Sequence, residues 1–267
     1  YDDNAQDLGK QAAAHAFVRD RTRAIRQDFT IQATRLDPAC IQVHEQIARF
    51  HFVSGHRLQA LPPADFDAFQ NTEQGRKVLQ SLLEFYTDAK QAGRLDLLGQ
   101  EAEFRAYHLL THLPDWEICS QAMRLNGGGP LLAWAQQVAL AFHCADAPAF
   151  FHLCRMSPPA GVPVQQFYLA LCVLQSHFAR LCLHARSIIT KAFQQQTTLP
   201  IALLIDWFGL PLEDLFTVQA DQALLNDLPE PIPKHPVAFI EDLVRGLSIS
   251  VILGHDQSTL RKPVQPI

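Results

Sequence analysis

The chain has 267 residues, of which 48% are apolar, and a formal net charge of -5. The apolar content excludes an intrinsically disordered protein, and the negative charge excludes a protein whose whole surface binds nucleic acid. The six cysteines form no C-x-x-C pair, and we find neither a signal peptide nor an apolar stretch of about 18 residues, so we expect reduced thiols and no membrane contact. Because the sequence begins without methionine, we expect it to be a region of a longer protein.

Apolar periodicity predicts a first helix over residues 5–30. Arg19, Arg23 and Arg26 share one stripe, which fits a solvated face or, alternatively, a contact with phosphate or an acidic partner. The opposite stripe is apolar and comprises Ala14, Phe17, Ala24, Ile25 and Phe29. Arg21 and Asp28 project with this apolar set, so we predict that both are buried and paired with counter-charges.

A second helix is predicted over residues 38–54, where apolar residues on nearly all sides indicate burial. Glu45 and Arg49 are four residues apart and would pair with each other and with Arg21 and Asp28. Asn71-Thr72 is predicted to cap the next helix, which ends near Gly93.

Further helices are predicted as a hairpin over 100–126 that turns at Pro114, a pair over 131–144 and 147–155, and a long helix over 164–194. These pairs follow no strict repeat. We therefore predict an all-α region over 1–194, an irregular α-solenoid of TPR-like helical hairpins.

Residues 195–267 have the pattern of a small α+β module. Thr198 is predicted to cap a short helix with Pro200 in its first turn, a second helix follows Pro211, and strands are predicted at 237–241 and 247–254. This spacing predicts a winged helix with a C-terminal extension. A helical solenoid that ends in a winged helix is the layout of a PCI domain.

Three stretches carry a resemblance to a known family. They read RDRTRAIRQDFTIQ at residues 19–32, HEQIARFH at 44–51 and EAEFRAYHLL at 101–110, and together they resemble the SAC/GANP family of nuclear mRNA-export scaffolds. Gln100 stands where the family pattern usually has Asn. Beyond residue 113 the likeness is one of pattern alone.

The resemblance implies a non-catalytic scaffold subunit of the TREX-two complex, located in the nucleus at the nuclear pore. It implies pairing with a second PCI-domain protein through the winged-helix ends, and with a small acidic protein of the DSS/Sem type. Nuclear pore and export factors would be bound by regions outside this chain. The resemblance implies no cofactor.

Two sets of residues are candidate contact sites in the C-terminal module. The predicted partner interface consists of apolar residues too numerous for a small module to bury alone: Leu203, Trp207, Phe208, Leu210, Leu212 and Phe216. RNA bound jointly with the partner would contact Lys191, Lys234 and Arg245. Readout of duplex bases is not expected, because the second helix of the module begins Leu212-Glu213-Asp214.

Other functions are weaker alternatives. His143, Cys144, His152 and Cys154 lack the regular spacing of a zinc site, so no metal is expected. No G-x-S-x-G or phosphate-loop motif is present, and we expect no enzyme activity. Two alternatives stay open: a PCI subunit of a transcription-elongation pair, proteasome lid or signalosome, and an all-helical enzyme or ligand carrier.

Overall fold

The computed structural model describes residues 2–32, 34–59, 61–124, 128–174 and 177, and three short strands at 198–200, 250–252 and 259–261. The chain divides into two compact units, which we describe separately. Unit 1 comprises Tyr1–Gln136 with Pro158–Gln175, and unit 2 comprises Gln137–Ser157 with Ser176–Ile267. Within the described ranges, no helix combines the length and apolarity needed to cross a membrane.

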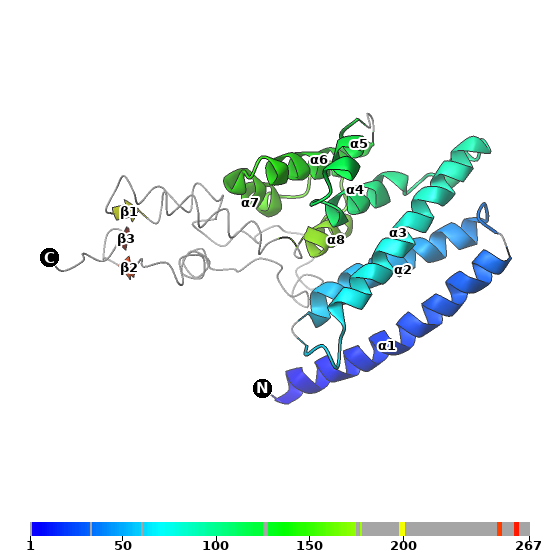
Figure 1. Cartoon of the computed structure of the whole chain (residues 1–267), viewed down its shortest axis with the longest axis horizontal. Coiled ribbons are helices and arrows are strands. Elements are labelled where there is room, and N and C mark those ends of the chain that lie inside the picture. The colour runs from blue at the N-terminus through cyan, green and yellow to red at the C-terminus, as the bar shows by residue number, and fades with distance from the viewer. Residues whose placement is uncertain are drawn as a thin grey trace. The chain divides into compact units, whose positions relative to one another are not determined.

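Unit 1 is built from helices (Figure 1). In chain order they are α1 (Asp2–Ile31), α2 (Pro38–Leu58), α3 (Ala68–Gln91), the 3-10 turn η1 (Leu95–Leu97), α4 (Glu101–Thr111), α5 (Trp116–Met123), the first half of α6 (Gly129–His143) and α8 (Val164–Leu174). Helix α2 contacts α1, α3 and α8, while α4 contacts α3, α5 and α8. Helices α2 and α4 therefore form the centre of this unit.

The core of unit 1 is filled by large side chains from α3 and α4. Leu79, Leu82 and Tyr86 of α3 are fully buried, as are Phe104 and Tyr107 of α4. Burying an apolar side chain of this size contributes about 1.5–3 kcal/mol to the free energy of folding. The spacing of three, four and seven residues places these side chains on one face of each helix.

Helices α2 and α3 approach closely where glycines face the partner helix. A Cβ atom added at Gly75 would lie 3.4 Å from the Cβ of His51. One added at Gly55 would lie 3.1 Å from Nδ2 of Asn71. The contact at Gly55 depends on the missing side chain, whereas a methyl group at Gly75 would lie at van der Waals distance from His51.

Unit 2 contains the second half of α6, helix α7 (Ala147–Arg155) and three strands, β1 (Thr198–Pro200), β2 (Ser250–Ile252) and β3 (Thr259–Arg261). The ring of Phe142 lies against Phe150 and that of Phe150 against Phe151, with centroids 6.4 Å and 5.7 Å apart. The strands form an antiparallel sheet in the order β1-β3-β2.

Aspartate side chains set the start of four helices. Asp37, Asp67, Asp115 and Asp146 precede α2, α3, α5 and α7, and each accepts a hydrogen bond from a backbone N–H of the first turn. The predicted cap at Asn71-Thr72 is therefore wrong. Helix α3 begins one turn earlier, because the side chain of Asp67 accepts from the N–H of Gln70 at 2.8 Å.

The all-α prediction is confirmed for the described helices, including the hairpin that turns at Pro114. β2 lies within the strand predicted over 247–254, but the helix cap at Thr198 is wrong, because residues 198–200 form β1. Pro200 is tolerated there because β1 is an edge strand of the described sheet. The remaining winged-helix elements, the boundary at 194/195 and the strand at 237–241 lie outside the described residues and stay predictions.

Candidate functional site

The residues predicted to contact partners lie outside the described part of the chain. They are the six interface residues Leu203, Trp207, Phe208, Leu210, Leu212 and Phe216, and the three RNA-contact candidates Lys191, Lys234 and Arg245. Both sets therefore stay predictions. The residues predicted to be buried charges are described, and they lie in unit 1.

The predicted burial of Arg21 and Asp28 is wrong, because both side chains are exposed. Helix α1 contacts α2 and α3 through the stripe that contains Ala12, His15 and Phe29 instead. His15 sets this orientation: its buried ring stacks on Phe50 and lies edge-on to Phe66, and its Nε2 bonds to the side chain of Asn71. Ala14, Phe17 and Ala24 of the predicted apolar stripe consequently face outward, whereas Phe29 contacts His44 of α2.

The arginine stripe of α1 turns toward α3. Arg19 donates to Oε1 of Gln70 at 2.7 Å, and Arg26 donates to Oε1 of Gln74 at 3.5 Å. Burial lowers the pKa of Arg26, and the charge of Arg23 lowers it further. The solvated face that we predicted is therefore correct for exposed Arg23 but wrong for Arg26, which is partly buried between helices.

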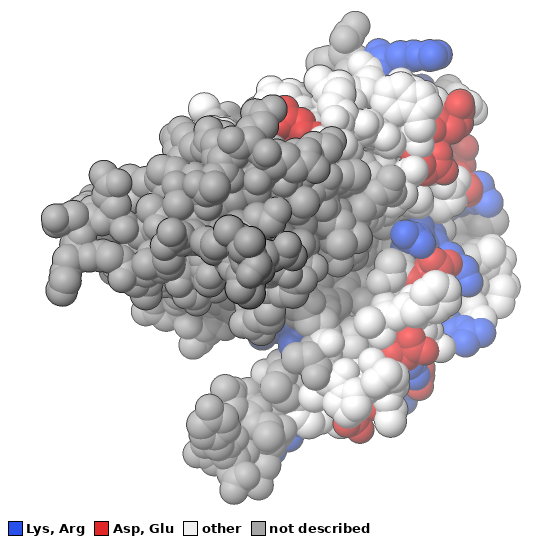
Figure 2. Space-filling model, turned by 60° about the vertical axis from the view of Figure 1, so that its left-hand side comes forward, with Lys and Arg blue, Asp and Glu red and all other residues white. Residues whose placement is uncertain are grey.

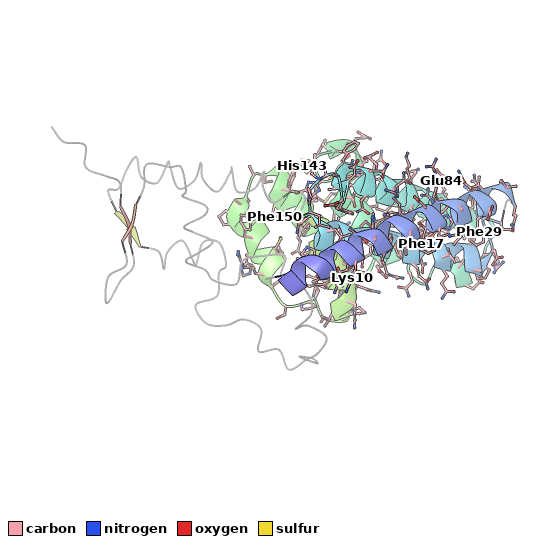
Figure 3. The ribbon with its side chains drawn as sticks, turned by 90° about the horizontal axis from the view of Figure 1, so that it is seen from below. Lys10, Phe17, Phe29, Glu84, His143 and Phe150 are labelled. Atoms are coloured by element: carbon pink, nitrogen blue, oxygen red, sulfur yellow. The ribbon has the colours of Figure 1, made fainter. Side chains whose placement is uncertain are left out.

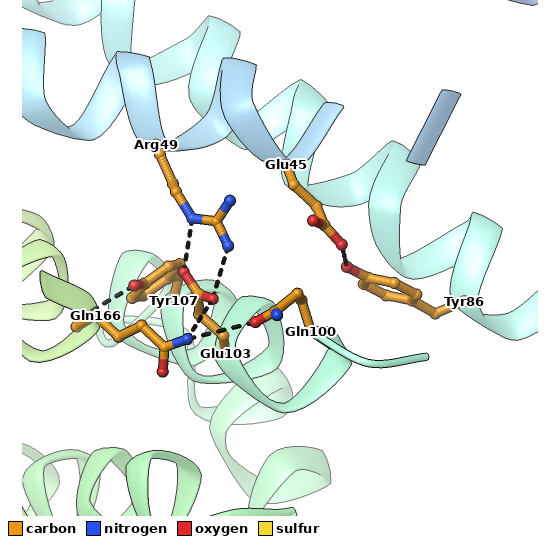
Figure 4. Close-up of polar contacts among 7 residues, drawn as sticks. All are labelled: Glu45, Arg49, Tyr86, Gln100, Glu103, Tyr107 and Gln166. Carbon is orange, nitrogen blue, oxygen red and sulfur yellow. Dashed lines mark hydrogen bonds and ion pairs between the residues drawn. The ribbon is translucent and has the colours of Figure 1, made fainter. Parts of the chain in front are cut away.

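Glu45 and Arg49 are placed near the core as predicted, but they have different partners (Figure 4). The guanidinium of Arg49 donates through Nε and Nη2 to the two carboxylate oxygens of Glu103 at 2.9 Å and 2.8 Å. It also lies over the ring of Phe104, 4.9 Å from its centroid. Glu45 accepts instead from the hydroxyl of Tyr86 at 2.7 Å.

Burial governs the charges of this network. It raises the pKa of Glu45, and the hydrogen bond from Tyr86 offsets that effect only in part. For Arg49 burial acts to lower the pKa, but the hydrogen bonds and charge of Glu103 outweigh it, so the pKa of Arg49 is raised. The Arg49–Glu103 contact is bidentate, which is the strongest geometry for a guanidinium and a carboxylate.

Helix α8 joins the same network. The side-chain amide of Gln166 donates to Oε2 of Glu103 at 2.9 Å, and the backbone carbonyl of Gln166 accepts from the hydroxyl of Tyr107 at 3.0 Å. Glu103 therefore connects Arg49 of α2 with Gln166 of α8, across 54 and 63 residues of sequence. Its partners hold three helices in one arrangement.

A second polar cluster lies between α1, α2 and α3, and no sequence pattern predicted it. Oδ1 of Asn71 lies 3.1 Å from Nε2 of His15 and 2.9 Å from Nδ1 of His51. Nδ2 of Asn71 donates to the backbone carbonyl of His51 at 2.8 Å. Because one amide oxygen accepts from both rings, each imidazole is protonated at that nitrogen. Burial lowers the pKa of His51 to about 4.

The described surface offers little that would position a substrate. A shallow depression at the α1–α2 connection includes Arg35 and Asp88, and these pair with each other at 3.5 Å. Among the described residues no group of three His, Cys, Asp or Glu side chains is arranged to hold a metal. On the face shown in Figure 2, basic and acidic side chains of the described helices are interspersed.

Comparisons with known proteins place the sequence in a family. A profile of the SAC3/GANP family matches residues 3–222. The chain is 35% identical over 203 residues to SAC3 family protein 1 of Schizosaccharomyces pombe, an alignment that covers 67% of the chain and 18% of that relative. It is 27% identical over 215 residues to SAC3 family protein B of Arabidopsis thaliana, which covers 74% of the chain and 12% of the relative.

Protein xmas of Drosophila melanogaster is 34% identical over 169 residues, which covers 62% of the chain and 8% of that protein. The chain thus spans less than a fifth of the length of each of these relatives. The resemblance read from three short stretches extends over most of the sequence. This chain belongs to the SAC3/GANP family.

Proposed function

We propose that this chain is a non-catalytic scaffold region of a nuclear mRNA-export subunit, which couples transcription to export at the nuclear pore. Family membership over residues 3–222 is the observation that carries the proposal. It also disfavours the alternative of a proteasome-lid or signalosome subunit. The chain covers less than a fifth of its relatives, so pore and export factors would bind regions outside it.

The helices of unit 1 support a scaffold role because their buried polar side chains bond to one another. Glu103 is bonded by Arg49 and Gln166, and Asn71 by two histidines. Buried networks that are satisfied in this way fix one arrangement of the helices. A fixed stack of helices can hold a docking module in a defined orientation.

The docking module is the predicted winged helix over residues 195–260. The strand order β1-β3-β2 supports it, because β1 pairs with β3, the last strand of the C-terminal pair β2–β3. Through this module the chain pairs with a second PCI-domain protein, and a small acidic DSS/Sem-type protein joins the pair. A stable interface buries about 1,600 Å² in total, about half from each partner, and the six apolar candidates around Trp207 would form the centre of this chain's share.

Co-expression tests the pairing. We expect the chain alone to aggregate and to become a soluble 1:1 complex with the PCI-domain protein of the same complex, measured by size exclusion with light scattering. Trp207→Asp and Phe216→Asp should abolish the complex, because each places a charge in the apolar interface. Trp116→Asp is the matched control, since Trp116 is 57% exposed on α5 of unit 1. A complex that survives Trp207→Asp and Phe216→Asp would contradict the proposed interface.

Joint RNA binding is tested by a salt series on that complex. Each phosphate contact to single-stranded RNA contributes about 0.7 to the slope of log affinity against log salt. Replacement of Lys191, Lys234 and Arg245 by Gln should therefore reduce the slope by about 2. An unchanged slope would place the RNA elsewhere on the complex, while loss of the protein complex itself would reveal a folding defect.

A further inference from the structure

The outward stripe of α1 has a pattern that usually belongs in an interface. Seven residues at alternating spacings of four and three share this stripe, and all are exposed: Lys10, Ala14, Phe17, Arg21, Ala24, Asp28 and Ile31. Phe17 is 62% exposed and Ile31 is 82% exposed. Figure 3 is seen from the side of α1 and shows Lys10, Phe17 and Phe29 along this helix. Four of the seven, Ala14, Phe17, Ala24 and Ile31, are small or apolar, and the 4-3 spacing is that of the seam in a helix pair.

Arg21 and Asp28, two of the three charged residues on the stripe, have no partner of opposite charge among the described residues. Neither the carboxylate of Asp28 nor the guanidinium of Arg21 makes an ion pair or side-chain hydrogen bond with a described residue. Arg21 instead lies over the ring of Phe17, with its Cζ 5.3 Å from the centroid. This contact holds the guanidinium along the stripe.

The stripe is complementary to itself in the antiparallel direction. A two-fold axis through Ala24 would place Phe17 of one copy opposite Ile31 of the other, since each is seven residues from Ala24. Arg21 lies about 4.5 Å before Ala24 along the helix axis and Asp28 about 6 Å after it. Arg21 of each copy therefore lies opposite Asp28 of the other copy, so the dimer contains two pairs of opposite charge. The small side chain of Ala24 would allow the helices to approach at the centre.

We propose that two copies of this chain pair through the Phe17–Ile31 stripe of α1, antiparallel and two-fold symmetric. Such an interface is isologous, so every contact occurs twice. The second copy is the occupant that the pattern specifies, because it supplies an acid opposite each Arg21 and an apolar residue opposite each Phe17. The inference does not depend on the winged-helix module.

The pair is weak by itself. Residues 17–31 span about 21 Å of helix, which is small beside a standard interface, so we expect a dissociation constant on the order of 100 μM. Sedimentation velocity of the full chain over a concentration series measures it. If the chain needs its PCI partner for solubility, the heterodimer is used, and the expected product is a pair of heterodimers.

Charge reversal tests the register of the pair. Arg21→Asp and Asp28→Arg each replace two attractive contacts by two repulsive ones, so each should weaken association at least about tenfold. The double variant R21D/D28R restores opposite signs and should return association to within about threefold of the original. Arg21 and Asp28 are both exposed, so circular dichroism should show unchanged helix content in each variant.

Arg23→Asp is the matched control. It changes the net charge by the same amount as Arg21→Asp. Because Arg23 lies about 100° round the helix from Ala24, outside the stripe, the change should leave association unchanged. A chain that stays monomeric at about five times the expected dissociation constant would overturn the proposal and assign the stripe to another occupant. A dimer that is insensitive to both Arg21→Asp and Asp28→Arg would overturn it too, because another surface would then hold the copies together.

Discussion

Replacement of Glu103 by Gln should destabilise unit 1 because it removes the counter-charge of Arg49. The carboxylate of Glu103 is 2% exposed, whereas the side chain of Arg49 is 30% exposed. Breaking a fully buried ion pair costs about 3–5 kcal/mol, and partial access of Arg49 to water reduces this to about 2–3 kcal/mol. For a protein of this size the midpoint of thermal unfolding should fall by about 4–12 °C.

The control is a pair with the same geometry on the surface. Arg94 donates to both oxygens of Asp96 at 2.9 Å and 2.8 Å, the same distances as in the buried pair. Its side chains are 43% and 60% exposed, so Asp96→Asn should leave the unfolding midpoint unchanged within error. The comparison isolates burial from hydrogen-bond geometry.

Urea unfolding measures the loss of stability in Glu103→Gln, and faster hydrogen exchange of the α4 amides would assign that loss to unit 1. A double-mutant cycle with Arg49→Met should give a coupling energy above about 1 kcal/mol, because each single change leaves one charge without its partner. Equal effects of Glu103→Gln and Asp96→Asn, or a coupling energy near zero, would refute the reasoning. The Arg49–Glu103 contact would then add nothing to the stability of the helix stack.

Three further predictions concern the α2–α3 contact. Gly75→Ala should stabilise by up to about 1 kcal/mol, whereas Gly55→Ala should destabilise, because its Cβ would lie 3.1 Å from Asn71, which is fixed by three hydrogen bonds. Asn71→Leu keeps the branched shape but leaves two imidazole N–H groups without an acceptor, and should cost about 2–4 kcal/mol in urea unfolding. The unfolding free energy should also fall by about 3 kcal/mol as pH drops from about 6.5 to 4, since the pKa of His51 is lowered to about 4 and the unfolded chain binds its proton more readily. A His51→Gln variant should show a smaller slope over that range, and an equal slope would contradict the assignment.

Helix positions could be predicted from the sequence because they depend on local signals. Pro114 ended one helix and Asp115 capped the next, and Gly93 with its φ of +71° followed the end of α3. The cap of α3 was placed one turn late because Asp67 and Asn71 are both good capping residues. Only the fold shows that the side chain of Asn71 is hydrogen-bonded to His15 and His51.

The orientation of α1 could not be predicted for a different reason. Apolar residues occur on both sides of this helix, so its periodicity does not say which side faces α2. The buried side was decided by His15, whose contacts with Phe50 and Asn71 are distant in sequence. A polar ring fixed the orientation, and the rule that places the apolar stripe of a helix inside gave the wrong answer for Arg21 and Asp28.

The residues that carry the family likeness fall into two sets once their contacts are known. In the stretches 44–51 and 101–110, the polar residues Glu45, Arg49 and Glu103 are held by the internal network. In the stretch 19–32, Arg19 and Arg26 contact α3, but Arg21 and Asp28 contact no described partner of opposite charge. Packing within unit 1 therefore accounts for the first set and leaves the second unexplained. A charged pair on an exposed apolar stripe is best explained by a contact made outside the fold, which charge reversal at Arg21 and Asp28 would test directly.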